Sequence, residues 1–278
     1  MTLNAIKAVV FDWAGTVIDF GCRAPVVALI QVFGDNAVEI TDAEARIDMG
    51  KAKRDHIRAL LAMPRIAGCW REAHGVPATE ADVSRLHDAV EPMMRAAARD
   101  AALLIPGAAE LSARLRSDGV RIGSCTGYTR AMMADILPLA AEQGYSPDVV
   151  VCAGETREGR PSPLMMWKAL VDLGAWPAGA CVKIDDATVG IDEGLAAGAW
   201  VVGLSASGNG VGLSREALAA LSQGERDRRI AAAAQALERS GAHYVVDSVA
   251  DLGPVLDDIA ARITAGETPA KRILPQAR

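Results

Sequence analysis

Short runs of apolar residues alternate with longer amphipathic segments along most of the chain. Strands of a parallel sheet are buried on both faces, so they are apolar almost throughout, and these runs have that character. Their alternation with helical segments predicts an α/β fold built on a doubly wound parallel sheet. The six predicted strands are Ile6–Phe11, Val120–Cys125, Val149–Cys152, Cys181–Ile184, Trp200–Leu204 and Tyr244–Val246.

Glycines follow several of the helical segments that separate these strands. Glycine adopts the left-handed backbone conformation that commonly ends a helix, and proline is favoured in the first turn. The helices predicted in this way are Pro106–Asp118 before Gly119, Ser162–Leu173 with Pro163 in its first turn and Gly174 after it, and Thr188–Ala197 before Gly198.

The segment between Phe20 and Ala101 differs, because it contains no convincing strand and one helical pattern follows another. Two residue pairs in it have the spacing of a capping box, in which two side chains bond each other's backbone amides at a helix start. These pairs are Thr41 with Glu44 and Thr79 with Asp82, and the predicted helix breaks are Gly50, Pro64, Gly75 and Pro77. The segment is therefore predicted to be a helical insertion.

An insertion after the first strand gives the simplest division of the chain. We expect a Rossmann-like catalytic core made of residues 1–19 and 102–266, with a helical cap made of residues 20–101. Residues 267–278 contain prolines and polar residues without periodicity, so they are predicted to form a flexible tail.

Composition and charge narrow the class of partner. The chain has 278 residues, 51% of them hydrophobic, and a formal net charge of −6. Such a chain has no basic field to attract nucleic acid or anionic lipid, so a small charged metabolite is the expected partner. It lacks both a signal-peptide pattern and a run of about 18 apolar residues, which predicts a cytoplasmic protein outside the membrane. Five cysteines without a CxxC pair argue against disulfides and a zinc site.

Polar residues follow three of the predicted strands. Asp12 ends the first strand, and open α/β sheets bind their ligands at the carboxyl ends of strands. Thr126 and Gly127 follow the second strand, where a hydroxyl and backbone amides at a helix start can hold phosphate oxygens. Asp185 and Asp186 end the fourth strand, and paired carboxylates suit a hard cation. These residues predict a site for a phosphate and a metal ion.

Arg160, in the loop GRPSP, can neutralise a phosphoryl group and form bidentate bonds to it. Taken alone, Asp12 could merely cap the turn that follows it. In this order along the chain, however, the four motifs resemble those of the haloacid dehalogenase superfamily, from Ile6 to about Gly266. The resemblance implies Asp12 as nucleophile and metal ligand, Thr126 with Gly127 as phosphate anchor, Arg160 as charge stabiliser and Asp186 as a ligand of Mg²⁺.

Two positions depart from the superfamily pattern. Its phosphatases usually carry a second aspartate two residues after the nucleophile, which protonates the leaving alkoxide, and this chain has Ala14 there. Loss of a general acid commonly slows a reaction about 10²–10⁴-fold, so a competent phosphomonoesterase is not expected. Ala14 can still offer its backbone carbonyl to the metal. An acid is also often found where this chain has Gly190, which leaves Asp185 or water to complete the metal site.

The predicted cap contains MGKAKRDH at residues 49–56. Together with DWAGT at 12–16 and Cys22, this string resembles the phosphonoacetaldehyde hydrolase family, where the lysine matching Lys53 forms a Schiff base with the substrate aldehyde. A protonated imine accepts the electrons of the C–P bond, so the carbon leaves as an enamine and no acid is required at position 14. The resemblance therefore implies hydrolysis of phosphonoacetaldehyde to acetaldehyde and phosphate, through an aspartyl phosphate at Asp12. Without the motif, Lys53 would be an ordinary solvated lysine.

His56 lies three residues after Lys53, on the same face of a helix, and the resemblance implies that it moves a proton during imine formation. A structural histidine is the alternative. Lys51 would point elsewhere on a helix and is assigned to solvent. Three further residues match positions near the site in the family and are expected to line the pocket: Cys22, Met49 and Tyr128.

Two other classes of function stay open. One is a different phosphatase or phosphotransferase of the superfamily, which Ala14 and Lys53 argue against. The other is a noncatalytic ligand-binding relative, which the presence of all four motifs argues against. The resemblance also implies a homodimer and a place in 2-aminoethylphosphonate degradation, downstream of a transaminase. The apolar segment Pro25–Phe33 is a candidate contact surface, unless it packs internally.

Overall fold

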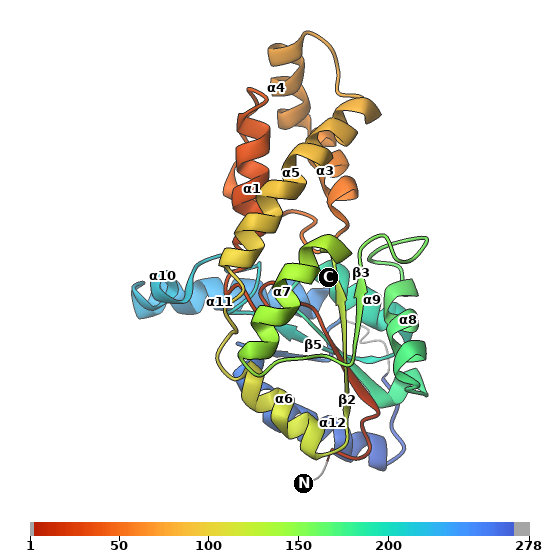
Figure 1. Ribbon diagram of the computed structural model, residues 1–278. Helices are drawn as coiled ribbons and strands as arrows, with labels where there is room; N and C mark the ends of the chain where they lie inside the picture. The colour runs from red at the N-terminus through yellow and green to blue at the C-terminus, as the bar shows by residue number, and fades with distance from the viewer. Residues whose placement is uncertain (1–2, 270–278) are drawn as a thin grey trace, which may run out of the picture.

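The computed structural model describes residues 3–269. Its six strands form one parallel sheet in the order β3-β2-β1-β4-β5-β6 (Figure 1), which confirms the predicted fold class. Every predicted strand is present, and the ends shift by at most two residues. The strands are β1 (Ala8–Phe11), β2 (Arg121–Thr126), β3 (Val149–Cys152), β4 (Cys181–Asp185), β5 (Trp200–Leu204) and β6 (Tyr244–Val246).

The register of the central strands decides which side chains meet at the end of the sheet. Phe11, the last residue of β1, pairs with Ser124 on one side and Ile184 on the other. Asp12 therefore comes level with Asp185, while Thr126 and Asp186 lie one residue further along their strands. The carboxyl ends of β1, β2 and β4 thus bring the predicted site residues together.

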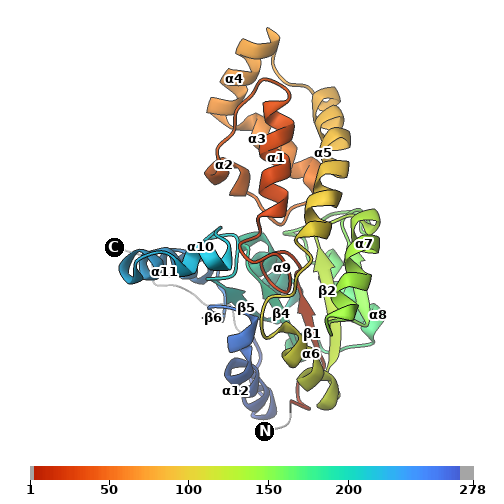
Figure 2. The same ribbon diagram turned by 60° about the vertical axis from the view of Figure 1, so that its left-hand side comes forward.

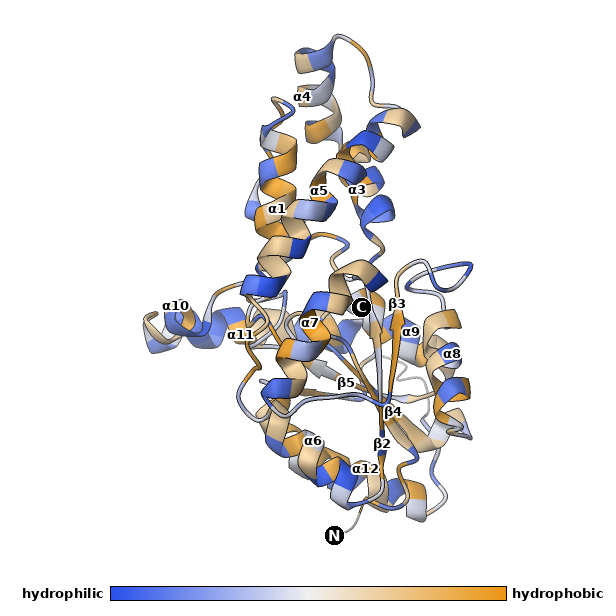
Figure 3. Cartoon of the chain, in the orientation of Figure 1, coloured by the Kyte–Doolittle hydropathy of each residue, from blue (hydrophilic) through white to orange (hydrophobic). Residues whose placement is uncertain are grey.

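Helices cover both faces of the sheet. Val9 and Phe11 pack with residues of α6, α7 and α12, whereas Ala8 and Val10 point the other way and pack with α8. In Figure 3 the strands are largely coloured as hydrophobic, while most helices carry both colours. The core helices are α6 (Ala108–Ser117), α7 (Arg130–Glu142), α8 (Leu164–Leu173), α9 (Thr188–Ala197), α10 (Arg215–Ala219), α11 (Gln223–Arg239) and α12 (Leu252–Thr264), with short 3₁₀ turns η1 (Ala178–Ala180) and η2 (Val249–Asp251).

Five helices lie between β1 and α6, beyond the carboxyl ends of the strands (Figures 1 and 2). Both predicted capping boxes are formed, and each such cap typically stabilises a helix by about 1 kcal/mol. All four predicted breaks are also observed. Pro64 begins α4 and Gly75 ends it in a left-handed conformation, while Gly50 lies between α2 and α3 and Pro77 between α4 and α5. The helices are α1 (Ala24–Gly34), α2 (Asp42–Arg46), α3 (Lys53–Ala62), α4 (Pro64–His74) and α5 (Glu80–Asp100).

The apolar face of α1 is used inside the chain. Leu29, Val32 and Phe33 are all buried, and α1 packs along α5. Internal packing therefore takes up most of the segment Pro25–Phe33, the candidate contact surface, whereas Val27 on the same helix is 53% exposed. Among the described residues, the exposed large apolar side chains include Trp167 and Val171 on α8 and nearby Trp176.

None of the helices in residues 3–269 is long and apolar enough to cross a membrane. Most of the predicted tail, residues 270–278, lies outside the described residues.

Candidate active site

Asp12 lies immediately after β1 and is almost completely buried. The Nη1 atom of Arg160 donates a hydrogen bond of 2.7 Å to its carboxylate. Burial raises the pKa of Asp12 to about 6; the charge of Arg160 opposes this shift and that of Asp185 adds to it. The carboxylate is thus largely ionised at neutral pH and available as a nucleophile.

Asp12, Asp185 and Asp186 form a cluster of buried carboxylates whose oxygens lie within 4.8 Å of one another. The Asp186 carboxylate accepts hydrogen bonds from Thr16 Oγ1 at 3.3 Å and from the Asn209 amide at 2.7 Å. Burial, followed by the charges of Asp12 and Asp185, raises the pKa of Asp186 well above its usual value. Buried carboxylates that repel one another provide the oxygen donors that Mg²⁺ prefers, so this cluster fits such an ion.

Gly190 and Asp185 occupy complementary space. A Cβ atom at Gly190 would lie 1.9 to 2.3 Å from the carboxylate atoms of Asp185, which no side chain can tolerate. The Asp185 carboxylate therefore fills the volume above position 190, where superfamily members often carry an acid. This placement favours Asp185 over water as the replacement for that acid.

A buried ion network lies beneath the cluster. Glu193 of α9 accepts from Arg160 Nε at 3.0 Å and pairs with Lys183 Nζ at 2.9 Å. Lys183 also pairs with Asp185 at 3.1 Å. Burial and the charge of Arg160 oppose protonation, but Glu193 and Asp185 outweigh them and raise the pKa of Lys183.

Lys183 and Glu193 were not predicted from the sequence. A lysine inside an otherwise apolar strand was the available signal, since buried lysines are rare unless paired. The network also changes the expectation for Arg160. All three guanidinium nitrogens already donate within the protein, to Asp12, Glu193 and the carbonyl of Cys125. Because each nitrogen is already engaged, Arg160 offers the site its charge rather than a free bidentate fork.

The segment after β2 forms one wall of the pocket. Thr126 is buried, and its hydroxyl accepts a hydrogen bond of 3.1 Å from the Tyr128 amide. Gly127 lies so close to the insertion that a Cβ there would be 3.1 Å from the carbonyl oxygens of Gly50 and Lys51. The buried hydroxyl of Tyr128 finds no hydrogen-bond partner within residues 3–269, which suits a group that faces a substrate.

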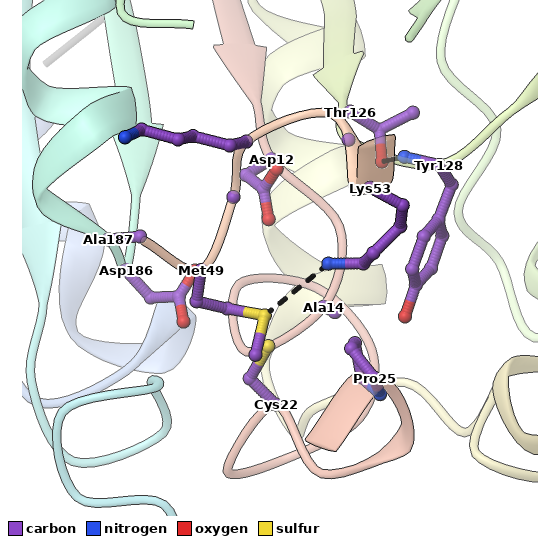
Figure 4. A pocket seen from close by; sticks show the side chains of 13 residues that line it. Asp12, Ala14, Cys22, Pro25, Met49, Lys53, Thr126, Tyr128, Asp186 and Ala187 are labelled. Atoms are coloured by element: carbon purple, nitrogen blue, oxygen red, sulfur yellow. Dashed lines mark hydrogen bonds between the residues drawn. The ribbon is translucent and has the colours of Figure 1, made fainter. Parts of the chain in front are cut away.

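Lys53, the first residue of α3, is buried and points into this pocket (Figure 4). Its Nζ lies 3.3 Å from His56 Nδ1 and 3.7 Å from the sulfur of Met49. Burial lowers the pKa of Lys53 to about 8, although the charges of Cys22 and Asp12 oppose the shift. Burial and the charge of Lys53 lower the pKa of His56 to about 2, so its ring is neutral at physiological pH.

The structure brings the predicted site residues around one cavity. Asp12, Ala14 and Asp186 line it from the core, while Met49 and Lys53 line it from the insertion. The remaining lining residues include Cys22, Lys51, Thr126, Gly127 and Tyr128. Arg160 and His56 act from behind this lining, through Asp12 and Lys53 respectively. Lys51 is only partly exposed and pairs with Asp48 at 2.8 Å, so its assignment to solvent is incomplete.

Comparison with known proteins identifies the family of this chain. The haloacid dehalogenase-like hydrolase family matches residues 6–198. A phosphonoacetaldehyde hydrolase from Paraburkholderia xenovorans (strain LB400) is 50% identical over 96% of this chain and 100% of its own length. The chain belongs to the phosphonoacetaldehyde hydrolase family of haloacid dehalogenase-like hydrolases. A further member, from Nitratidesulfovibrio vulgaris (strain DSM 19637 / Miyazaki F), is 44% identical over 95% of this chain and 94% of its own.

Solved structures agree with the assignment to this family. The crystal structure of a phosphonoacetaldehyde hydrolase-like protein from Oleispira antarctica has a TM-score of 0.94 and 43% identity, and the match covers 97% of this chain and 98% of that one. The β-phosphoglucomutase of Clostridium difficile, at 16% identity and a TM-score of 0.65, shares the fold alone; the match covers 94% of this chain and 99% of that one.

Proposed function

We propose that this hydrolase cleaves the C–P bond of phosphonoacetaldehyde, giving acetaldehyde and phosphate. The observation that carries the proposal is the buried amine of Lys53, which faces the same cavity as the Asp12 carboxylate. Ala14 supports it, because a reaction that releases an enamine requires no acid at this position. The names of the relatives at 44% and 50% identity support the same substrate.

The proposed reaction uses two covalent bonds to the protein. The neutral amine of Lys53 attacks the aldehyde carbon, and the carbinol oxygen takes up one proton from solvent and leaves as water, which gives a protonated imine. A carboxylate oxygen of Asp12 then attacks phosphorus, and the electron pair of the broken C–P bond forms the enamine. Water hydrolyses the aspartyl phosphate to release phosphate. Protonation of the enamine on carbon and hydrolysis of the imine release acetaldehyde and restore Lys53.

His56 is proposed to take the proton that Lys53 loses. Its Nδ1 lies 3.3 Å from Lys53 Nζ, within reach of the proton. The charge of Lys53 is one cause of the low pKa of the ring, and this cause disappears once the proton has left the amine. The acquired proton would be held only briefly, because the buried ring disfavours the charged form. That property suits a relay that returns the proton to the departing carbinol oxygen.

Mg²⁺ is the proposed cofactor, held by the carboxylates of Asp12 and Asp186 and the backbone carbonyl of Ala14. When bound, it would screen the repulsion between the Asp12 carboxylate and the phosphonyl group and hold the two in line. Arg160 keeps Asp12 ionised and oriented. Thr126, Gly127 and Tyr128 are proposed to bind the phosphonyl oxygens, and Cys22 and Met49 to pack against the two-carbon unit.

We further propose a cytoplasmic homodimer that acts in 2-aminoethylphosphonate degradation, downstream of a transaminase that forms the aldehyde. The five cysteines are all free, in keeping with a reducing compartment. The insertion between residues 20 and 101 is proposed to act as the cap domain, since it supplies Lys53.

Borohydride trapping tests the proposed function directly. Addition of phosphonoacetaldehyde and borohydride should inactivate the enzyme and leave an ethyl adduct on the peptide that contains Lys53. Lys53→Arg should neither label nor release acetaldehyde, because a guanidinium cannot form the imine. Lys168→Arg, at an exposed lysine on α8 outside the cavity, is the control and should label at Lys53 and turn over. Turnover without any adduct, or rapid hydrolysis of simple phosphate esters instead, would favour a phosphatase and overturn the proposal.

A further inference from the structure

The loop of residues 205–213, which follows β5, joins three parts of the site. The backbone amide of Asn209 donates the 2.7 Å hydrogen bond to the Asp186 carboxylate. Ser207 Oγ donates to the carbonyl of Gly15 at 2.8 Å, and the carbonyl of Ser207 accepts from the Gly21 amide at 2.7 Å. The loop is thereby tied to the segment after Asp12 and to the start of the insertion.

Arg46, the last residue of α2, reaches this loop from the insertion. Its Nη1 donates to the side-chain carbonyl of Asn209 at 3.2 Å, and the Asn209 side-chain amide donates back to the Arg46 carbonyl at 3.1 Å. The guanidinium also donates to the carbonyls of Gly21 and Gly212, each at 2.9 Å. The Nε atom of Arg46 donates a hydrogen bond of 2.6 Å to the Asp42 carboxylate, which holds the guanidinium in place.

Glycines allow these close approaches. A Cβ at Gly212 would lie 2.5 Å from Arg46 Nε, and one at Gly208 would lie 2.6 Å from the Cβ of Asp186. Both distances are shorter than real Cβ atoms make, so a larger residue at Gly212 or Gly208 would displace Arg46 or Asp186. The contact is thus closely packed as well as hydrogen-bonded.

The same Arg46 carbonyl that binds Asn209 also accepts a hydrogen bond of 3.2 Å from the Met49 amide. Met49 in turn contacts the amine of Lys53. The cavity beneath this segment is about 30 Å³, which is room for little more than a water molecule. Because this space is smaller than a phosphonate, we expect the segment that carries Met49 and Lys53 to move away from the core when one binds.

We propose that Arg46 and Asn209 form a clasp that holds residues 46–53 over the site and ties their closure to the position of the Asp186 carboxylate. Both are positioning residues, since neither lines the cavity. When the clasp forms, the Asn209 side chain is fixed by Arg46 and its backbone amide is aimed at Asp186. The reciprocal pair of hydrogen bonds between Arg46 and Asn209 thereby fixes the positions of Lys53 and of the carboxylate cluster at the same time.

Hydrogen exchange tests the clasp without substrate or metal. In Arg46→Ala and Asn209→Ala, amide exchange in residues 47–53 should be about tenfold faster or more, because hydrogen bonds to a charged group are lost. Exchange in β1 and β4 should not change. Arg65→Ala is the matched control: this cap arginine also binds a carboxylate, Glu44, but does not contact the loop, and its exchange should match the wild type. Equal exchange in all variants, or the same increase in Arg65→Ala, would overturn the clasp.

Calorimetric titration with Mg²⁺ tests the tie to Asp186. Arg46→Ala should weaken Mg²⁺ binding on the order of fivefold or more, although Arg46 is not a ligand. The double variant Arg46→Ala/Asn209→Ala should bind Mg²⁺ no more weakly than either single variant, because the two residues act as a unit. Faster exchange with unchanged Mg²⁺ affinity would refute the tie. If Arg46→Ala does not fold, Asn209→Ala and Arg46→Lys replace it, and Arg46→Lys should exchange at an intermediate rate.

The two arms of this test depend differently on the proposed function. Only the Mg²⁺ arm rests on it, whereas exchange is measured on the protein alone. A failure to release acetaldehyde together with faster exchange in both clasp variants would count against the proposed substrate and leave the clasp standing.

Discussion

The amine of Lys53 should react as a base with a pKa near 8. Burial lowers that pKa from the ordinary value of 10.5 to about 8. At pH 7 about a tenth of such an amine is neutral, compared with about 0.03% of an ordinary lysine, so the nucleophilic form is roughly 300-fold more abundant. The rate of imine formation should therefore rise about tenfold per pH unit up to pH 8 and then level off.

Reductive trapping with acetaldehyde and cyanoborohydride across pH 6–10 measures this rate, with the adduct at Lys53 quantified by mass spectrometry. Adducts on exposed lysines such as Lys168 provide the internal control, and their rates should still be rising at pH 10. If labelling at Lys53 also rises without levelling, the amine is not perturbed by its surroundings and the reasoning from burial fails.

The same shift has a consequence for stability. Because the folded pKa lies below the unfolded one, the unfolded chain binds more protons between pH 8 and 10.5, and stability falls as the pH is lowered through that range. The shift of 2.5 units corresponds to about 3 kcal/mol at neutral pH. Lys53→Met should therefore unfold at higher urea concentration than the wild type at pH 7, with little difference near pH 10.5. A less stable variant at pH 7 would show that the amine is not destabilising.

Three other outcomes are expected. Mg²⁺ affinity, measured by calorimetry, should fall as the pH drops below about 6, because protons then compete for the Asp12 carboxylate; constant affinity from pH 5 to 7.5 would contradict this. Gly190→Ala should lose about 3 kcal/mol or more in urea unfolding, since its Cβ overlaps Asp185, whereas Gly68→Ala in α4 should be neutral or stabilising. Ala14→Asp should not produce efficient hydrolysis of simple phosphate esters, and a rate near that of C–P cleavage would count against the Lys53 mechanism.

The sequence predicted the sheet well because parallel strands leave a strong local signal. Continuous apolar runs placed all six strands, and the acids at two of their ends predicted the carboxylate cluster. The helices α10 and α11 were not predicted. The long helix α11 buries only two residues, so its apolar periodicity is weak.

Contacts between distant segments could not be predicted from periodicity. Arg46 and Asn209 are 163 residues apart, and Arg160 and Glu193 are 33 apart. Lys53 was singled out by its motif, whereas its burial follows from the packing of the insertion against the core. That packing also converts His56 from an ordinary titrating histidine into a neutral one.

Charge balance explains why these buried groups occur together. Asp12, Asp185, Asp186 and Glu193 carry four negative charges when ionised, while the buried partners Arg160 and Lys183 supply two positive ones. With the amine of Lys53 in its neutral, reactive form, two negative charges are left in a site screened from water. Protonation can neutralise part of this excess negative charge, because the pKa values of Asp12 and Asp186 are raised. One divalent cation would cancel it completely and allow both aspartates to ionise. Arg160, Lys183 and Glu193, which lie behind the cavity lining, would therefore help to set the charge of the ion that the site accepts.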